Sequence, residues 1–155
     1  MSATLADLRT AVVSRLQAIP QLAGVEILSE DRNDITTMIA TALAQGKGLV
    51  VVVQTGNERF TQAGNPTPVS TVELFVEVGE IPAINRAPSG SRLPASDASA
   101  LIIRALHHHV WTPGKTLIVT EKVYDRNDKK KLVTHTPVFS TTIEYSGGSP
   151  VPTKG

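Results

Sequence analysis

The chain has 155 residues and no cysteine, so one domain is expected, and disulfide frameworks, zinc–cysteine sites and cysteine nucleophiles are excluded. Apolar residues make up 41% and charged residues 19%, a composition typical of globular proteins rather than of disordered or membrane-embedded chains. The net charge of +1 conceals an asymmetry, because residues 1–80 carry nine acidic and five basic residues, whereas residues 81–155 carry five acidic and ten basic ones.

The N-terminal third predicts two amphipathic helices with a short strand between them. Apolar residues recur at helical spacing over 3–19, where Thr4 can serve as the N-cap and Pro20 ends the helix. A strand is expected over 25–28, and helical spacing returns over 34–45. The N-terminus has neither the basic nor the apolar segment of a signal peptide, so synthesis in the cytosol is expected.

The middle of the chain predicts two strands. Residues 49–54 form an apolar run without alternation, which indicates a strand buried on both faces. Residues 69–78 alternate well, and Phe75 lies between Glu73 and Glu77 on the more polar face. Phe75 is therefore either an isolated exposed aromatic residue or a contact for another molecule.

Two segments rich in glycine and proline, 56–68 and 80–95, are predicted to be loops. The second contains Arg86 and Arg92 and shows no apolar periodicity. A loop of this length in a small domain is usually functional or disordered.

The last third predicts one more helix and a closing hairpin. The helix is expected over 97–111, with Ser96 as its N-cap. Strands are expected over 116–124 and 132–145, joined by a turn at 125–128. Pro137 lacks the N–H that a sheet needs, so the first half of the last strand is predicted to be an edge or bulged strand.

This order of elements predicts an α+β fold, with a mostly antiparallel four- to five-stranded sheet and helices packed on one face. A single domain is expected over 1–146. Residues 147–155, which are rich in glycine and proline, are expected to form a flexible C-terminal tail.

No recognised catalytic or metal-binding constellation is present. The consecutive histidines 107–109 would point about 100° apart on a helix and cannot converge on one metal. Residues 112–116 resemble the end of a phosphate-binding loop, but His109 stands where that loop needs glycine, and a strand follows instead of a helix. Glu73 and Glu77 would lie about 13 Å apart on a strand, too far for a glycosidase pair. We therefore expect no enzyme activity, no metal and no cofactor.

The densest positive cluster is predicted at a hairpin tip, where it can contact phosphates or remain solvated and protect a sheet edge from aggregation. Its members are Arg126, Lys129, Lys130 and Lys131.

The whole layout resembles one family of structural proteins. The segments that carry the resemblance are the helix with Leu5, Leu8, Val12 and Leu16, the run from Ile19 to Val25, the valine strand 49–53 followed by Gln54, Thr55 and Gly56, the strand 72–78 with its long loop, and the helix 98–106 before the closing hairpin. Over residues 3–145 this arrangement is similar to that of the tail terminator, or tail completion, proteins of long-tailed bacteriophages and related tail-like particles.

The resemblance implies a small α+β protomer that forms a ring, most often a hexamer. Such a ring caps the tail tube, terminates tail polymerisation and provides the surface that joins the head. The implied location is the head-proximal end of the virion tail, after assembly in the host cytoplasm. The implied partners are further copies of the chain, the tail tube protein and a head–tail connector or neck protein, with DNA passing nonspecifically through the lumen and no membrane contact.

The residues expected at interfaces follow from this resemblance. Loop 80–95, with Arg86 and Arg92, is expected to dock on the tube, the basic hairpin tip to face a neighbour or the lumen, and Phe75 to pack between subunits. The opposite charges of the two halves suit head-to-tail contacts within a ring. Two alternatives stay open: a neck or connector protein of similar fold, and a small cytosolic enzyme or ligand-binding module.

Overall fold

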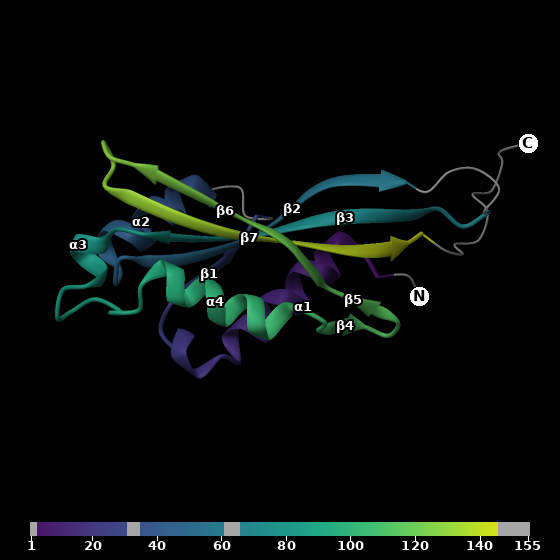
Figure 1. Cartoon of the computed structure of the whole chain (residues 1–155), viewed down its shortest axis with the longest axis horizontal. Coiled ribbons are helices and arrows are strands. Elements are labelled where there is room, and N and C mark those ends of the chain that lie inside the picture. The colour runs from purple at the N-terminus through teal and green to yellow at the C-terminus, as the bar shows by residue number, and fades with distance from the viewer. Residues whose placement is uncertain (1–2, 31–34, 61–65, 146–155) are drawn as a thin grey trace, which may run out of the picture.

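A long twisted sheet runs the length of the molecule in the computed structural model, which describes residues 3–30, 35–60 and 66–145 (Figure 1). The helices are α1 (Leu5–Gln17), the 3-10 helix η1 (Pro20–Leu22), α2 (Ile35–Gln45), α3 (Pro82–Asn85) and α4 (Ala95–Leu106). The strands are β1 (Glu26–Ser29), β2 (Leu49–Phe60), β3 (Val69–Glu80), β4 (Val110–Thr112), β5 (Lys115–Thr116), β6 (Ile118–Asn127) and β7 (Leu132–Glu144). Within these described ranges, no helix is long and apolar enough to cross a bilayer.

The main sheet has the strand order β1-β2-β3-β7-β6, while β4 and β5 form a separate small hairpin. The β2–β3, β3–β7 and β7–β6 pairs are antiparallel, and the β1–β2 pair is parallel. The prediction of an α+β fold with a mostly antiparallel sheet is confirmed, with the correction that the sheet is mixed. The single-domain prediction for 1–146 remains a prediction, and the predicted tail 147–155 lies outside the described residues.

One face of the sheet carries the main core. Side chains of α1 and α4 pack there on alternate residues of the central strands, and Leu8, Val51, Leu74, Ile102 and Phe139 are fully buried. The first helix begins as predicted, because Thr4 and Asp7 form a reciprocal capping box.

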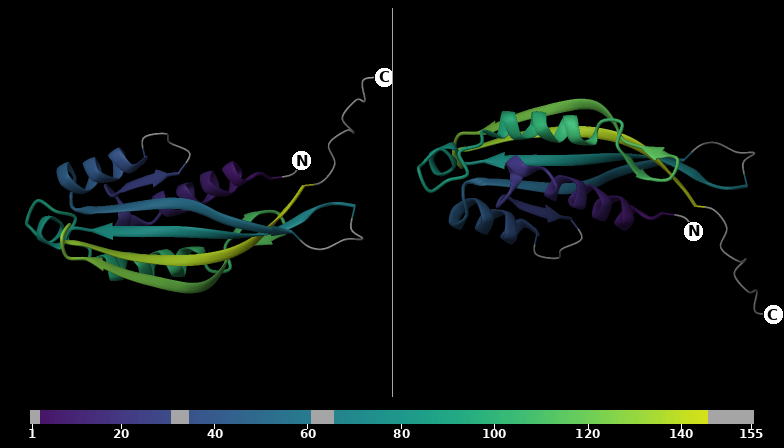
Figure 2. Two further views of the ribbon diagram at one scale, coloured as in Figure 1. Left: turned by 90° about the horizontal axis from the view of Figure 1, so that it is seen from above. Right: turned by 90° about the horizontal axis from the view of Figure 1, so that it is seen from below.

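The opposite face carries a second apolar cluster beneath α2. It contains Leu28, Leu43, Val50 and Val52, with Met38 packed against them. The valine strand is thus buried on both faces, as predicted, but the prediction that helices pack on one face is wrong. The physical reason is the parallel β1–β2 pair, which needs a crossover connection, and α2 provides it on the side opposite α4 (Figure 2).

Two predicted boundaries and one predicted strand position are also wrong. The predicted loop 56–68 begins as strand, because β2 continues to Phe60 past a bulge between Thr55 and Glu58. The hairpin turn follows Asn127 rather than occupying 125–128. Of the two alternatives for Pro137, the edge strand is wrong, because β7 is a central strand. The β3–β7 ladder is interrupted between the Phe75–Val138 and Val78–His135 pairs, and the β6–β7 ladder has an irregularity between Val119 and Glu121.

The third predicted helix is shorter than the apolar spacing of its sequence predicts. α4 begins at Ala95 with Pro94 as its N-cap, so Ser96 is not the cap, and it ends at Leu106. Beyond it, His108 adopts a φ of 64° and its N–H donates to the carbonyl of Leu117 at 2.7 Å. The chain therefore turns into the β4–β5 hairpin, which carries Trp111 into the core.

We predict that Thr141→Val destabilises the fold by about 1–3 kcal/mol, because the buried indole N–H of Trp111 donates to Thr141 Oγ1 at 2.8 Å and would lose its acceptor. Thr141→Ser keeps the hydroxyl and is the matched control. Urea unfolding followed by the fluorescence of Trp111, the single tryptophan, measures both. Equal stability of the two variants would contradict a role for this hydrogen bond.

Candidate interaction surfaces

Two of the segments identified in the sequence, loop 80–95 and the basic hairpin tip, meet at one end of the molecule (Figure 1). Between them lies a cleft of about 540 Å³, which we call the basic cleft. It is lined by Pro82, Ala83, Arg86, Arg126, Asn127, Asp128, Lys131, Leu132 and Val133. The structure thus brings together residues that are about 40 positions apart in the sequence.

The charges around the basic cleft are only partly neutralised. Arg86 Nε lies 3.5 Å from Glu80 Oε2, and Arg126 Nε lies 2.8 Å from Asp128 Oδ1. The hydrogen bond to Asp128 raises the pKa of Arg126 above its usual value. Lysines 129–131 are exposed and make no ion pair with any residue in the described part of the chain. The surface therefore remains positive and open to an anionic partner.

Glu80 organises the loop behind the cleft. Its carboxylate is buried and accepts hydrogen bonds from Asn85 Nδ2 at 2.6 Å and from the backbone N–H of Ala95 at 3.1 Å. Asn85 Nδ2 also donates to the carbonyl of Leu93 at 2.7 Å, and the hydroxyl of Ser91 donates to Asn85 Oδ1. The segment predicted to be an irregular loop thus has a defined, hydrogen-bonded conformation in which α3 is included.

Arg92 lies apart from Arg86. Its side chain is exposed and does not line the basic cleft. Its backbone adopts a φ of 64°, and its N–H donates to the carbonyl of Asn85 at 2.8 Å. This turn holds the two arginines on the same loop but on different parts of its surface.

Phe75 lies in the middle of the sheet, on the face opposite α1 and α4, and is half-buried. Its ring packs on Gly56 at the β2 bulge, where an added Cβ would come within 2.3 Å of the ring. Glycine at position 56 is therefore required for this packing, and Phe75 is a partly covered residue rather than an isolated exposed one. Its predicted place between subunits remains a prediction.

Glu73 and Glu77 flank Phe75 on the same strand. Glu73 is exposed, whereas Glu77 is half-buried and burial raises the pKa of its carboxyl above the ordinary value. Gln54 Nε2 donates to Glu77 Oε2 at 3.5 Å.

The histidines have local partners rather than a common centre. His107 Nδ1 accepts a hydrogen bond from the backbone N–H of Val119 at 3.1 Å. Burial, and secondly Arg15, lowers the pKa of His109, while burial, and secondly Lys122, lowers the pKa of His135. The described residues contain no group of three or more histidines and carboxylates placed to hold a metal ion.

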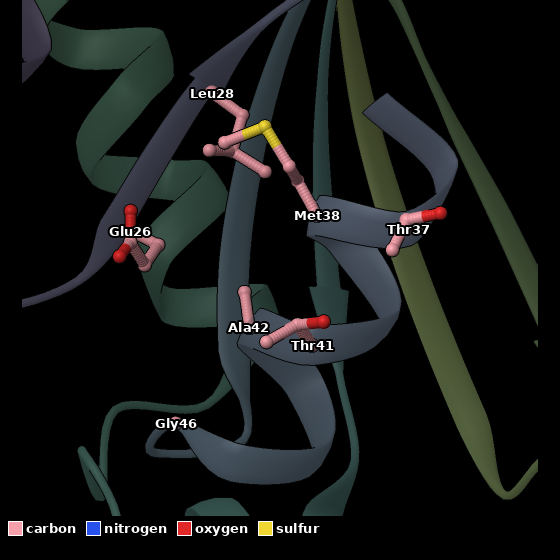
Figure 3. A pocket seen from close by; sticks show the side chains of 7 residues that line it. All are labelled: Glu26, Leu28, Thr37, Met38, Thr41, Ala42 and Gly46. Carbon is pink, nitrogen blue, oxygen red and sulfur yellow. The ribbon is translucent and has the colours of Figure 1, made fainter. Parts of the chain in front are cut away.

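A second hollow, of about 410 Å³, lies between β1 and α2, where the side chains of Leu28 and Met38 meet (Figure 3). Thr37, Thr41 and Glu26 also line it. Among the described residues that line it, Glu26 alone is ionisable.

The sequence reasoning missed the roles of Glu80 and Asn85. A signal for Glu80 was present, because position 80 continues the inward-facing register of Val76 and Val78. A carboxylate in that register needs buried hydrogen-bond donors. For Asn85 no local signal existed, because its partners lie across a turn.

Comparison with solved structures gives a likeness in fold. A chain of the structure described as a virion of native gene transfer agent (GTA) particle matches with a TM-score of 0.57 and 19% sequence identity. The match covers 88% of this chain and 94% of that chain. The two chains therefore share a fold. No protein-family model and no curated protein sequence matches this chain.

We predict that Glu80→Ala destabilises the protein by about 2–4 kcal/mol, because Asn85 and the N–H of Ala95 lose a buried acceptor. Arg86→Ala should cost less than about 1 kcal/mol, because Arg86 is 61% exposed and its ion pair is screened by solvent. Thermal unfolding of the two variants measures the difference. Comparable losses in both would argue against Glu80 as the centre of the network.

We also predict that Glu77→Gln is more stable than the wild type at neutral pH, by less than about 1 kcal/mol. A carboxyl whose folded pKa is raised loses stability as pH rises through the window above its ordinary pKa of 4.5. The gain should therefore vanish below that pH, where the carboxyl is protonated in both states. Urea unfolding across this pH range tests it, with exposed Glu73→Gln as the control. A gain independent of pH would contradict the electrostatic explanation.

Proposed function

We propose that this chain is a structural virion protein of a phage-like particle, and that copies of it form a ring, most often a hexamer, on the end of the tail tube. The observation that carries the proposal is the shared fold, which extends over nearly the whole of this chain and of a chain from a gene transfer agent virion. The ring would terminate tail polymerisation and present the surface on which a connector or neck protein joins the head.

The chemistry of the basic cleft supports binding rather than catalysis. Its basic groups are Arg86, Arg126 and Lys131, whose positive charges attract anions. Arg86 and Arg126 are also held by carboxylates. We therefore propose a role without enzyme activity and without a cofactor.

The location of the cleft supports different partners for its two walls. Loop 80–95 forms one wall and is our candidate for docking on the tube protein, while the hairpin tip forms the other wall and faces a neighbouring copy or the DNA in the lumen. The particle is assembled in the host cytoplasm, and this ring occupies the head-proximal end of the tail.

We predict that Arg86→Glu/Arg92→Glu stays folded but fails to stop tube growth. Both side chains are exposed, and Glu80 keeps its buried donors Asn85 and Ala95 although it loses its ion pair with Arg86. The variant is produced together with the tube protein from the same genome, and tube lengths are measured in electron micrographs. The expected result is a broad distribution of lengths instead of one length.

Arg59→Glu/Arg104→Glu makes the same change in charge at exposed positions away from the cleft and is the control. Tubes of normal length from the Arg86/Arg92 variant would remove the docking role of this loop. Tubes of the same length with and without the wild-type protein would overturn the terminator function itself.

A further inference from the structure

One half of the sheet has a face that no described helix covers. α2 covers the opposite face only near β1 and β2, where it packs on Leu28, Val50 and Val52. Across β3, β7 and β6 the same face continues, since Phe75 pairs with Val138 and Val138 pairs with Glu121. We call this part the open sheet face.

The open sheet face is apolar at its centre and acidic around it. Val138 is buried, Phe75 is half-buried, and Val123 on β6 is 47% exposed. Glu73 and Glu121 are exposed, and neither carboxylate has an ion pair or hydrogen bond with a residue in the described part of the chain. Exposed apolar side chains rimmed by charge are typical of a surface that binds a protein partner.

The charges that complement this face are at the hairpin tip of the same chain, but too far away to reach it. Glu121 pairs with Val138, which is six residues along β7 from Leu132 at the turn. At about 3.4 Å per residue, Glu121 is about 20 Å from the turn. This distance exceeds the Debye length at physiological ionic strength, so the exposed charges at the two places are screened from each other. The tip lysines can therefore neutralise an open sheet face only on another molecule.

The charge pattern of the edge strand argues against a symmetrical contact through β6. The two faces of β6 carry charges of opposite sign. Glu121 and Asp125 point to one face with Val123, and Lys122 and Arg126 point to the other face with Tyr124. Antiparallel pairing with a two-fold mate, centred on Val123 or Tyr124, would place like charges opposite each other, which is destabilising. A contact between two different surfaces is favoured instead.

We propose that the basic hairpin tip of one copy docks on the open sheet face of a second copy, with Lys129 and Lys130 against Glu73 and Glu121, and with Phe75 and Val123 covered. The inference rests on the proposed function, in which copies of the chain form a ring. The contact joins two different surfaces, and a contact of this type closes into a ring when the rotation between copies permits it.

A charge swap tests the contact. Lys129→Glu/Lys130→Glu reverses the tip and Glu73→Lys/Glu121→Lys reverses the face; each is expected to raise the dissociation constant of the assembly about ten-fold or more. The chain carrying all four substitutions restores opposite charges and should assemble again. Asp97→Lys/Arg104→Glu, at exposed positions on α4, is the control and should assemble like the wild type. Light scattering measures mass against concentration, and Trp111 fluorescence verifies folding.

The outcomes separate the two proposals. A chain with four substitutions that stays dissociated, or two reversed pairs that both assemble like the wild type, overturns the docking contact and leaves the ring function standing. Restored assembly, together with tube lengths that are the same with and without the protein, overturns the terminator function and supports the contact. Binding of a duplex oligonucleotide is measured as well. If Lys129→Glu/Lys130→Glu abolishes this binding but leaves assembly unchanged, the tip binds DNA and the contact is overturned. A wild-type chain that is monomeric at every concentration overturns it as well.

Discussion

The buried carboxylate of Glu80 lies where β3 leaves the sheet, and it binds residues at the end of α3 and at the start of α4. It accepts hydrogen bonds from the Asn85 side chain and from the first residue of α4, and it holds Arg86 at the protein surface. Removing a buried carboxylate from water is costly unless donors replace the water, so the loop must fold around it. The position of the basic cleft and the start of α4 both depend on this one group.

The sheet provides the second constraint, because different helices cover its two faces. α1 and α4 cover one face along most of its length, and α2 covers the other only beside β1 and β2. The remaining open sheet face has carboxylates around Phe75 and Val123, and the lysines lie at the far end of the hairpin. A protomer whose opposite charges lie too far apart to meet within one chain is well suited to contacts between copies.

Several features could be predicted from the sequence because they depend on short-range patterns. The N-cap at Thr4, the helical spacing over 34–45 and the alternation in β3 each involve residues a few positions apart. The end of α4 could not be predicted in this way, since the pattern continues to residue 111 while burial of Trp111 against Thr141 draws the chain into a hairpin. The packing of the Phe75 ring on Gly56 involves two neighbouring strands and likewise left no local signal.

By itself, the sequence determined the fold class, the strand buried on both faces and the residues that carry charge, because hydrophobic periodicity and composition are local properties. Only the tertiary structure decided that β1 pairs in parallel with β2, which places α2 on the second face, since strand partners are chosen by contacts between distant residues. Tertiary structure alone also brought Arg86 beside Arg126 and Lys131, because β3 and β7 are neighbours in space although about 50 residues apart.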